Sequence, residues 1–269
     1  MKVKKLLRAS TLLTVFFCVF LAGCASRPVM QDGIAINDPY EAQNRSVHNF
    51  NKAVDTRLLS PVAGLLKGRD DDTQPRAVRQ PGDPIGPLQM VVNAGRNLSL
   101  PGKTVNGLLQ GRPGAAGQNL ARFVVNSTVG LGGLFDPAGE NFRLTERDTD
   151  FGETLAVWGV PEGAYLELPL IGPSTARDAT GRVVDLALDP VNHVLSGRDR
   201  RAAFGLRVIS KAGERARFGD SVDSVLQDSA DSYAQLRLIW LMNRRHDLGE
   251  ESADFDPYDD EAAFDPYDE

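Results

Sequence analysis

Apolar residues recur at α-helical spacing along most of the chain, from about residue 38 to residue 247. The first helical segment begins at Asp38-Pro39-Tyr40-Glu41, where aspartate can cap the helix and proline suits its first position. The same spacing predicts further helices over 84–98, 101–110, 115–128, 150–158, 175–188, 200–218 and 228–246. One stretch, 165–171, alternates weakly and is predicted to be extended. The pattern therefore predicts an all-α fold class.

Glycine and proline interrupt these helices frequently, since the 269 residues include 26 glycines and 16 prolines. The most concentrated break is an apolar loop that contains Gly130, Gly132, Gly133 and Phe135, in which glycine permits positive φ and close approach of the backbone. Two interpretations of this loop stay open: a flexible apolar hairpin, or a tight turn packed in the core. The whole pattern predicts short amphipathic helices separated by Gly/Pro breaks.

The N-terminus has the three parts of a bacterial lipoprotein signal peptide. A basic segment precedes an uncharged apolar run that is too short to span a bilayer core about 30 Å thick. Small residues then precede Cys24, whose thiol is expected to carry the lipid. We expect residues 1–23 to be cleaved and residues 24–37 to form a lipidated linker. Because Ala25 replaces the aspartate that tends to retain lipoproteins in the inner membrane, the expected destination is the outer membrane.

Charge limits the partners of the expected mature protein. Removal of residues 1–23, which include four basic residues, changes the formal net charge from −6 to −10, and such a charge disfavours nucleic-acid binding. Residues 248–269 are strongly acidic and poor in apolar side chains, so they are predicted to form a disordered acidic tail. The sequence Phe-Asp-Pro-Tyr-Asp occurs twice in this tail, either as a weak binding motif or as part of a solubilising segment.

A polar stripe marks one face of the predicted helix 175–188. Asp178, Arg182 and Asp185 follow one another at steps of four and three residues, and aliphatic side chains cover much of the remaining surface. The stripe, together with the neighbouring Arg177, is a candidate lining for a polar route through the protein. An ordinary solvated helix face, with Asp178 and Arg182 paired on it, is an equally open interpretation.

Recognisable catalytic and metal-binding motifs do not occur in the sequence. His48, His193 and His246 have no second ligand at the spacing of a metal site on a helix, and no nucleophile elbow or phosphate-binding loop is present. We therefore expect no enzyme activity, no metal and no cofactor. A lipid hydrolase remains an alternative only if a serine, a histidine and an acid converge within hydrogen-bond reach in the fold.

Five sequence blocks, in order behind the lipoprotein signal, resemble the VacJ/MlaA family of outer-membrane phospholipid-transport lipoproteins. The first block, residues 38–51, is similar to the family's D-P-x-E-x-x-N-R-x-x-x-x-F-N opening. The others lie within 97–110, 122–136, 150–178 and 231–245. The resemblance covers about residues 38–247, so we expect these residues to form one helical MlaA-like domain.

The resemblance implies a ring-like arrangement of helices around an amphipathic channel. It implies that the protein removes misplaced phospholipid from the outer leaflet and passes it to a periplasmic lipid-shuttle protein, which maintains outer-membrane lipid asymmetry. It also implies a trimeric porin as a partner and a position on the periplasmic face. Asn49 and Phe50 fall where the family places a control on channel opening, although helical spacing also assigns Phe50 to the core. The alternative is a structural lipoprotein that scaffolds an outer-membrane complex without carrying lipid.

Overall fold

The computed structural model describes residues 29–31, 34–59, 86–217, 226 and 229–250. The predicted helical class is confirmed, with two small antiparallel hairpins added to it. The helices are α2 (Glu41–Val54), which continues into the π-helix η2 (Asp55–Leu59), α4 (Pro87–Leu109), α5 (Pro113–Thr128), α6 (Pro137–Glu140), α7 (Phe151–Val157), α8 (Ala176–Leu188), α9 (Pro190–Val194), α10 (Gly197–Arg217) and α12 (Ser232–Leu248). The strands are β1 (Val29–Gln31), β2 (Ile34–Ile36), β3 (Tyr165–Leu168) and β4 (Gly172–Thr175).

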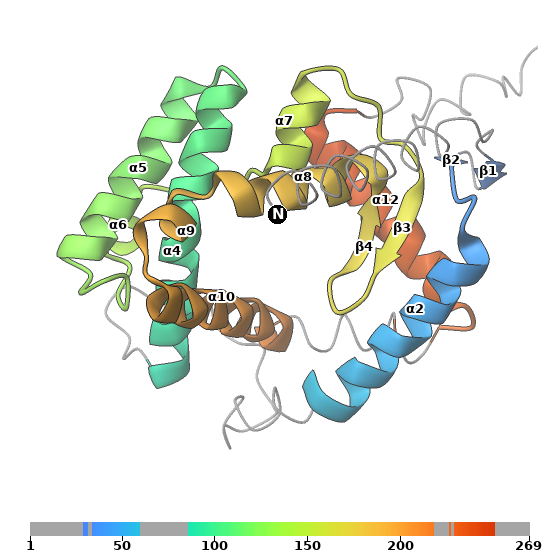
Figure 1. Ribbon diagram of the computed structural model, residues 1–269, viewed down its shortest axis with the longest axis horizontal. Coiled ribbons are helices and arrows are strands. Elements are labelled where there is room, and N and C mark those ends of the chain that lie inside the picture. Colours follow the sequence, from blue (N-terminus) through green and yellow to red (C-terminus); the bar gives the residue numbers. More distant parts are fainter. Residues whose placement is uncertain (1–28, 32–33, 60–85, 218–225, 227–228, 251–269) are drawn as a thin grey trace, which may run out of the picture.

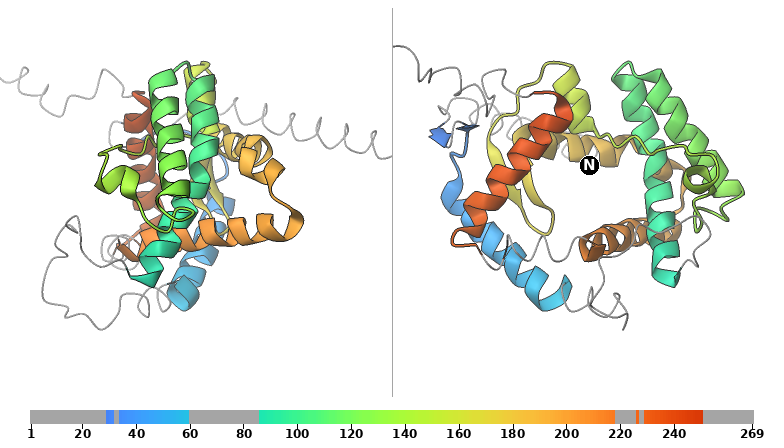
Figure 2. Two further views of the ribbon diagram at one scale, coloured as in Figure 1. Left: turned by 90° about the vertical axis from the view of Figure 1, so that its left-hand side faces the viewer. Right: turned by 180° about the vertical axis from the view of Figure 1, so that it is seen from behind.

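The elements follow one another around the edge of the molecule instead of forming stacked layers (Figure 1). α5 and α10 both pack on α4, α7 packs on α8, and the hairpin of β3 and β4 lies between α8 and α2. Seen from behind, α12 runs diagonally along this hairpin (Figure 2). The interior of the protein is therefore built from several separate contacts between pairs of neighbouring elements.

A small apolar cluster joins the two ends of the described chain. Ile36, Tyr165, Tyr233 and Leu241 are buried together, and the rings of Tyr165 and Tyr233 meet edge to face at 6.1 Å. Aromatic pairs with this geometry stabilise a core beyond their buried area. Ile36 belongs to the segment 24–37 that the sequence assigns to a linker, so the last residues of that segment are part of the folded domain.

α4 is one continuous helix, whereas the sequence predicts two helices separated before Pro101. Pro101 lies inside α4, where the missing N–H and the ring normally cost about 3 kcal/mol. Packing against both α5 and α10 offsets this cost. The α10 contact is close at Gly95, where a Cβ atom would lie 2.5 Å from the carbonyl oxygen of Leu206.

Helix caps follow the sequence in some places and not in others. The carboxylate of Asp150 accepts a hydrogen bond from the Glu153 N–H and begins α7 as predicted. Asp38 does not cap α2, which begins at Glu41. Its carboxylate instead accepts hydrogen bonds from Tyr233 and Arg237 of α12, because a long-range guanidinium is a stronger partner than a neighbouring amide.

Candidate functional site

α8 buries its charged face and exposes its aliphatic one. The side chain of Asp178 is 3% exposed, whereas Val183 is 58% and Leu186 is 63% exposed. This is the reverse of an ordinary surface helix, in which apolar residues face the core. Asp178 of the stripe is buried, and Arg182 and Asp185 are half-buried, so the interpretation as an ordinary solvated face is wrong.

Arg244 of α12 neutralises the inner end of this stripe. Its guanidinium donates to Asp178 at 2.9 and 3.1 Å and to Asp150 at 2.7 Å, so one cation joins α12 to α8 and to the first residue before α7. Burial opposes the charge of Arg244, but hydrogen bonds and charge from the two carboxylates outweigh it and raise its pKa. The family resemblance includes Arg244 in its last block, but the sequence gives no indication of this pairing.

The other stripe residues have different surroundings. The Arg177 side chain is 1% exposed and pairs with Glu250 at 2.6 Å, at the C-terminal end of α12. Asp185 accepts hydrogen bonds from Asn106 of α4 at 2.7 Å and from the Phe151 N–H at 3.0 Å. Desolvation is the main reason that the pKa of Asp185 is raised. Arg177 and Asp185 therefore connect α8 to its neighbours.

Arg182 is the member of the stripe that faces open space. It is half-buried and, among the residues that the structure describes, makes no hydrogen bond or ion pair. It lines a cavity of about 230 Å³ together with Asp178 and residues of α12, including Trp240 and Arg244. The cavity brings Asp178 and Arg182 together and does not include Arg177 or Asp185.

Apolar side chains are exposed over much of the remaining surface of the described residues. Among the described residues, buried polar and charged residues outnumber buried apolar ones, which is unusual for a protein surrounded by water. The exposed apolar residues occur on consecutive helices and turns: Leu120, Val124 and Val129 on and after α5; Val157, Trp158 and Val160 at the end of α7; Val194 on α9; and Phe204, Val208 and Ile209 on α10. Repetition on neighbouring elements indicates contact with an apolar medium or partner.

α2 shows the same reversal as α8. Phe50 is 50% exposed and Asn49 is also exposed, whereas the buried residues of α2 are Asn44 and His48. The assignment of Phe50 to the core is therefore wrong. The asparagine of this helix that holds the β3–β4 hairpin is Asn51, which donates to the carbonyl of Leu168 at 3.0 Å and also accepts from the hairpin turn.

The glycine loop after α5 is a tight turn in which Gly130 and Gly133 are buried and Gly132 is exposed. Gly132 and Gly133 have φ of +73° and +90°, and a Cβ atom on Gly133 would lie 2.6 Å from the side chain of Asn97. Gly130 is equally confined, since a Cβ atom there would lie 2.5 Å from a backbone oxygen. Phe135 is half-buried and Leu131 is 65% exposed. The loop thus packs its backbone inward and displays an apolar side chain outward.

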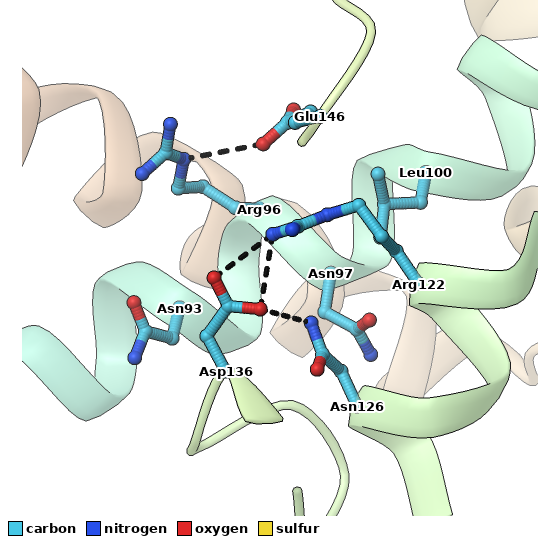
Figure 3. Close-up of a pocket in the computed structure, with 8 residues that line it drawn as sticks. All are labelled: Asn93, Arg96, Asn97, Leu100, Arg122, Asn126, Asp136 and Glu146. Atoms are coloured by element: carbon cyan, nitrogen blue, oxygen red, sulfur yellow. Dashed lines mark hydrogen bonds and ion pairs between the residues drawn. The ribbon is translucent and has the colours of Figure 1, made fainter. Parts of the chain in front are cut away.

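An ion-pair cluster directly behind this turn fixes it in place (Figure 3). Asp136 accepts hydrogen bonds from Arg122 at 2.9 and 3.0 Å and from Asn126 at 2.8 Å. The cavity beside this cluster holds only about 20 Å³, close to the space that one water molecule needs. This second cavity is too small for a lipid headgroup, and we assign the cluster a structural role.

A serine, a histidine and an acid do approach one another near the start of α12. His48 Nε2 lies 3.0 Å from Ser232 Oγ, but His48 Nδ1 lies 3.7 Å from Glu167 Oε1, beyond hydrogen-bond reach. The adjacent Asp231 carboxylate accepts the Ala234 N–H at 3.1 Å and pairs with Arg45 at 2.9 Å, so it caps α12 and does not orient His48. The arrangement is therefore an incomplete catalytic triad, because no acid in the described part of the chain is hydrogen-bonded to His48 Nδ1.

The family model described as MlaA lipoprotein matches residues 36–247. The chain belongs to the MlaA lipoprotein family. Residues 36–247 contain most of the described structure, including the α8 stripe and the cavity at Arg182.

Relatives from several bacteria share most of this length. The chain is 35% identical over 231 residues to the intermembrane phospholipid transport system lipoprotein MlaA of Shigella flexneri, with 85% of this chain and 83% of that protein covered. The MlaA of Escherichia coli (strain K12) is 34% identical over the same shares. An uncharacterized protein of Rickettsia bellii is 33% identical over 203 residues, covering 75% of this chain and 73% of its own length. The two relatives named MlaA are described as lipoproteins of an intermembrane phospholipid transport system.

A solved structure also resembles the fold. It was reported as the structural basis for maintenance of bacterial outer membrane lipid asymmetry and matches with a TM-score of 0.60 and 28% sequence identity. The match covers 78% of this chain and 98% of that chain. The family and the fold are therefore established by both sequence and structure.

Several predicted features fall on residues that the structure does not describe. Cys24, the signal peptide 1–23 and residues 251–269 of the predicted acidic tail lie outside the described residues. The first residues of the predicted tail are ordered, since Leu248 ends α12 and Glu250 pairs with Arg177. Over the described ranges, no set of three or more His, Cys, Asp or Glu side chains is placed to hold a metal ion. No helix in those ranges combines the length and the apolar character needed to cross a membrane.

Proposed function

We propose that this protein is a lipid-anchored lipoprotein on the periplasmic face of the outer membrane that moves misplaced phospholipid out of the outer leaflet and passes it to a periplasmic carrier. The reversed polarity of α8 carries the proposal. Exposed aliphatic area is unfavourable in water by roughly 25 cal/mol per Å², and this penalty disappears among acyl chains. Val183 and Leu186, which are more than half exposed, are therefore suited to a lipid environment.

Short helices with apolar faces can lie within one leaflet without crossing the bilayer. We infer that the exposed residues of α5, α7 and α10 contact acyl chains and that lipid passes along an amphipathic channel beside α8. Arg182 and Asp178 are the polar residues that we assign to this route, and Arg177 and Asp185 hold α8 in position. Phe50 and Asn49, both exposed on α2, are retained as candidates for the control of channel opening.

Partners follow from the family. The relatives are named as members of an intermembrane phospholipid transport system, and such a system needs a soluble carrier to cross the periplasm. We propose a periplasmic lipid-shuttle protein as the acceptor and a trimeric outer-membrane porin as the platform on which the lipoprotein docks. Lipidation of Cys24 would anchor the chain, the segment before Ile36 would connect the anchor to the domain, and residues 251–269 would form the acidic tail. Neither a cofactor nor catalysis is required, because transport breaks no covalent bond.

Two variants at one exposed position test the transport function. Leu186→Asp places a charge on the proposed lipid face, whereas Leu186→Met keeps the face apolar. The full lipoprotein, reconstituted in vesicles with fluorescent phospholipid, is assayed for transfer of that lipid to the purified carrier. We expect Leu186→Asp to reduce transfer by about tenfold or more, because a charged side chain is costly among acyl chains, and Leu186→Met to retain it.

The same assay separates transport from a purely structural role. Co-purification of the porin is measured for each variant in parallel with lipid transfer. Transfer that depends on Leu186 while porin binding is unchanged supports the transport function. A wild-type protein that binds the porin but transfers no phospholipid to the carrier would instead establish the scaffolding alternative.

A further inference from the structure

The cavity beside α12 contains more charge than the structural ion pairs account for. Its walls carry Arg182 and Asp178 from α8, Asp150 at the start of α7, and Trp240, Arg244 and Asp247 from α12. Three carboxylates and two guanidinium groups thus meet around about 230 Å³ of space. A cavity with both signs of charge is suited to a ligand that also carries both signs.

Arg182 is available for an anion. Arg244 pairs with both Asp150 and Asp178, so one negative charge of this group remains and attracts Arg182 through space. Arg182 itself makes no hydrogen bond within the described part of the chain, so its N–H donors are open to a ligand. A guanidinium remains charged even where burial lowers its pKa, and its planar donor geometry matches two oxygens of a phosphate.

A negative charge that could bind an ammonium group is provided by Asp247, on the exposed side of the cavity. Asp247 is exposed near the end of α12, and none of the contacts described for α12 neutralises it. Trp240 lies seven residues earlier on the same helix, about two helical turns away, and also lines the cavity. A carboxylate and an indole ring on one cavity wall are a favourable setting for a small organic ammonium group.

The size of the cavity fits a small headgroup. One water molecule needs about 10–15 Å³ of such space, so about 230 Å³ has room for a polar group of several non-hydrogen atoms. A phosphoethanolamine group is of this size and carries a phosphate and an ammonium two carbons apart. Acyl chains do not fit this space and would extend onto the exposed apolar surface.

We propose that this cavity binds the zwitterionic phosphoethanolamine headgroup of a phospholipid, with the phosphate at Arg182 and the ammonium between Asp247 and Trp240. The assignment rests on the proposed transport function and adds a preference for headgroup chemistry. Because three acidic side chains surround the space, a lipid with an anionic headgroup that lacks an ammonium is bound less tightly. Arg182 is then the contact shared by all phospholipids, and Asp247 the contact that discriminates among them.

Native mass spectrometry of the full lipoprotein in mild detergent tests the assignment. Phosphatidylethanolamine and phosphatidylglycerol with identical acyl chains are offered in equal amounts to the wild type and to Arg182→Gln, Asp247→Asn and Arg198→Gln. Arg198 is an exposed arginine on α10, so its variant makes the same charge change away from the cavity. Arg182→Lys keeps the charge without the planar fork.

We expect the wild type to prefer phosphatidylethanolamine. Arg182→Gln is expected to weaken binding of both lipids by about tenfold, since a charge-assisted contact to phosphate is lost, and Arg182→Lys to restore part of it. Asp247→Asn is expected to remove only the preference, by about threefold to fivefold, because this exposed charge is screened. Arg198→Gln should behave as the wild type. Thermal unfolding of each variant shows that the fold is intact.

Equal binding of the two lipids by the wild type, or variants of Arg182 and Asp247 that match Arg198→Gln, would overturn the headgroup assignment while lipid transfer to the carrier still supports the transport function. Soluble glycerophosphoethanolamine is offered in a separate arm. If it fills the cavity as tightly as the lipid does, the ligand is a free metabolite and the lipid assignment is wrong. A wild-type protein that neither binds phospholipid nor transfers it to the carrier would overturn the proposed function itself.

Discussion

Replacing Arg244 by methionine tests whether the ion pair between Arg244 and Asp178 stabilises the packing of α12 on α8. Methionine keeps most of the length of the side chain but removes its cation. In the wild type, the Arg244 guanidinium donates to Asp178 at 2.9 and 3.1 Å and to Asp150 at 2.7 Å. The Asp178 side chain is only 3% exposed, so in the variant its carboxylate loses both guanidinium hydrogen bonds and keeps only the cation of Arg182 across the cavity.

The expected loss follows from these exposures. Breaking a buried ion pair typically costs 3–5 kcal/mol, because the remaining charge is left uncompensated. The Asp150 side chain is 42% exposed and stays hydrated, so its share of the loss is small. Since Arg244 itself is 17% exposed, we take the lower end, about 3 kcal/mol. For a domain of this size, such a loss lowers the Tm by about 6–12 °C.

A double-mutant cycle with Asp178→Asn measures the pair directly. Thermal unfolding is followed by circular dichroism in one detergent for the two single variants, the double variant and the control Arg198→Met, which is expected to unfold like the wild type. Because the second substitution removes the uncompensated charge, we expect the double variant to be more stable than the sum of the single losses implies. Additive losses, or an Arg244→Met variant within about 1 kcal/mol of the wild type, would refute the argument.

Three further outcomes follow from single positions. Gly133→Ala is expected to destabilise the protein by about 2 kcal/mol because φ is +90° and the methyl group has no room, whereas Gly117→Ala, in open space on α5, should be neutral or slightly stabilising; chemical denaturation compares the two. A fluorophosphonate probe is expected to leave Ser232 unlabelled, as judged by mass spectrometry, since its catalytic triad is incomplete, and labelling above the level of Ser232→Ala would contradict this. The hydrogen bond from Arg45 lowers the pKa of Asp231 to about 2 from an ordinary 3.8, so its stabilising contribution is complete above that value and is lost as the pH falls toward 2. That contribution is at most about 1 kcal/mol for so exposed a pair, and an NMR titration in Arg45→Gln should show the pKa rising toward its ordinary value.

Local signals in the sequence were enough to place most helices. The capping pair of Asp150 and Glu153 predicted the start of α7, and helical spacing predicted α5, α8, α10 and α12 to within a few residues. These features depend on hydrogen bonds and periodicity within one turn of helix, which neighbouring residues decide. The weak alternation after Pro161 likewise indicated the extended strand at Tyr165.

The tertiary structure decided how those elements are used. Pro101 predicted a break, but packing on two neighbouring helices keeps α4 continuous. Asp38 had the position of a helix cap, but Arg237 lies 199 residues away in the sequence and becomes its partner in the fold. Long-range partners of this kind leave no local signal, so the sequence of residues 38–51 alone cannot identify them.

The sequence by itself determined that α8 has one charged and one aliphatic face, and it could not determine which of them is buried. Amphipathic spacing is the same whether a helix faces water or lipid, and the usual choice of the apolar face as the inner one presumes water outside. Only the fold supplies Arg244, Asn106 and Glu250, which satisfy the charges of α8 and allow them to be buried. Burial of the charges, and with it exposure of Val183 and Leu186, is therefore a property of the assembled fold and not of the helix alone.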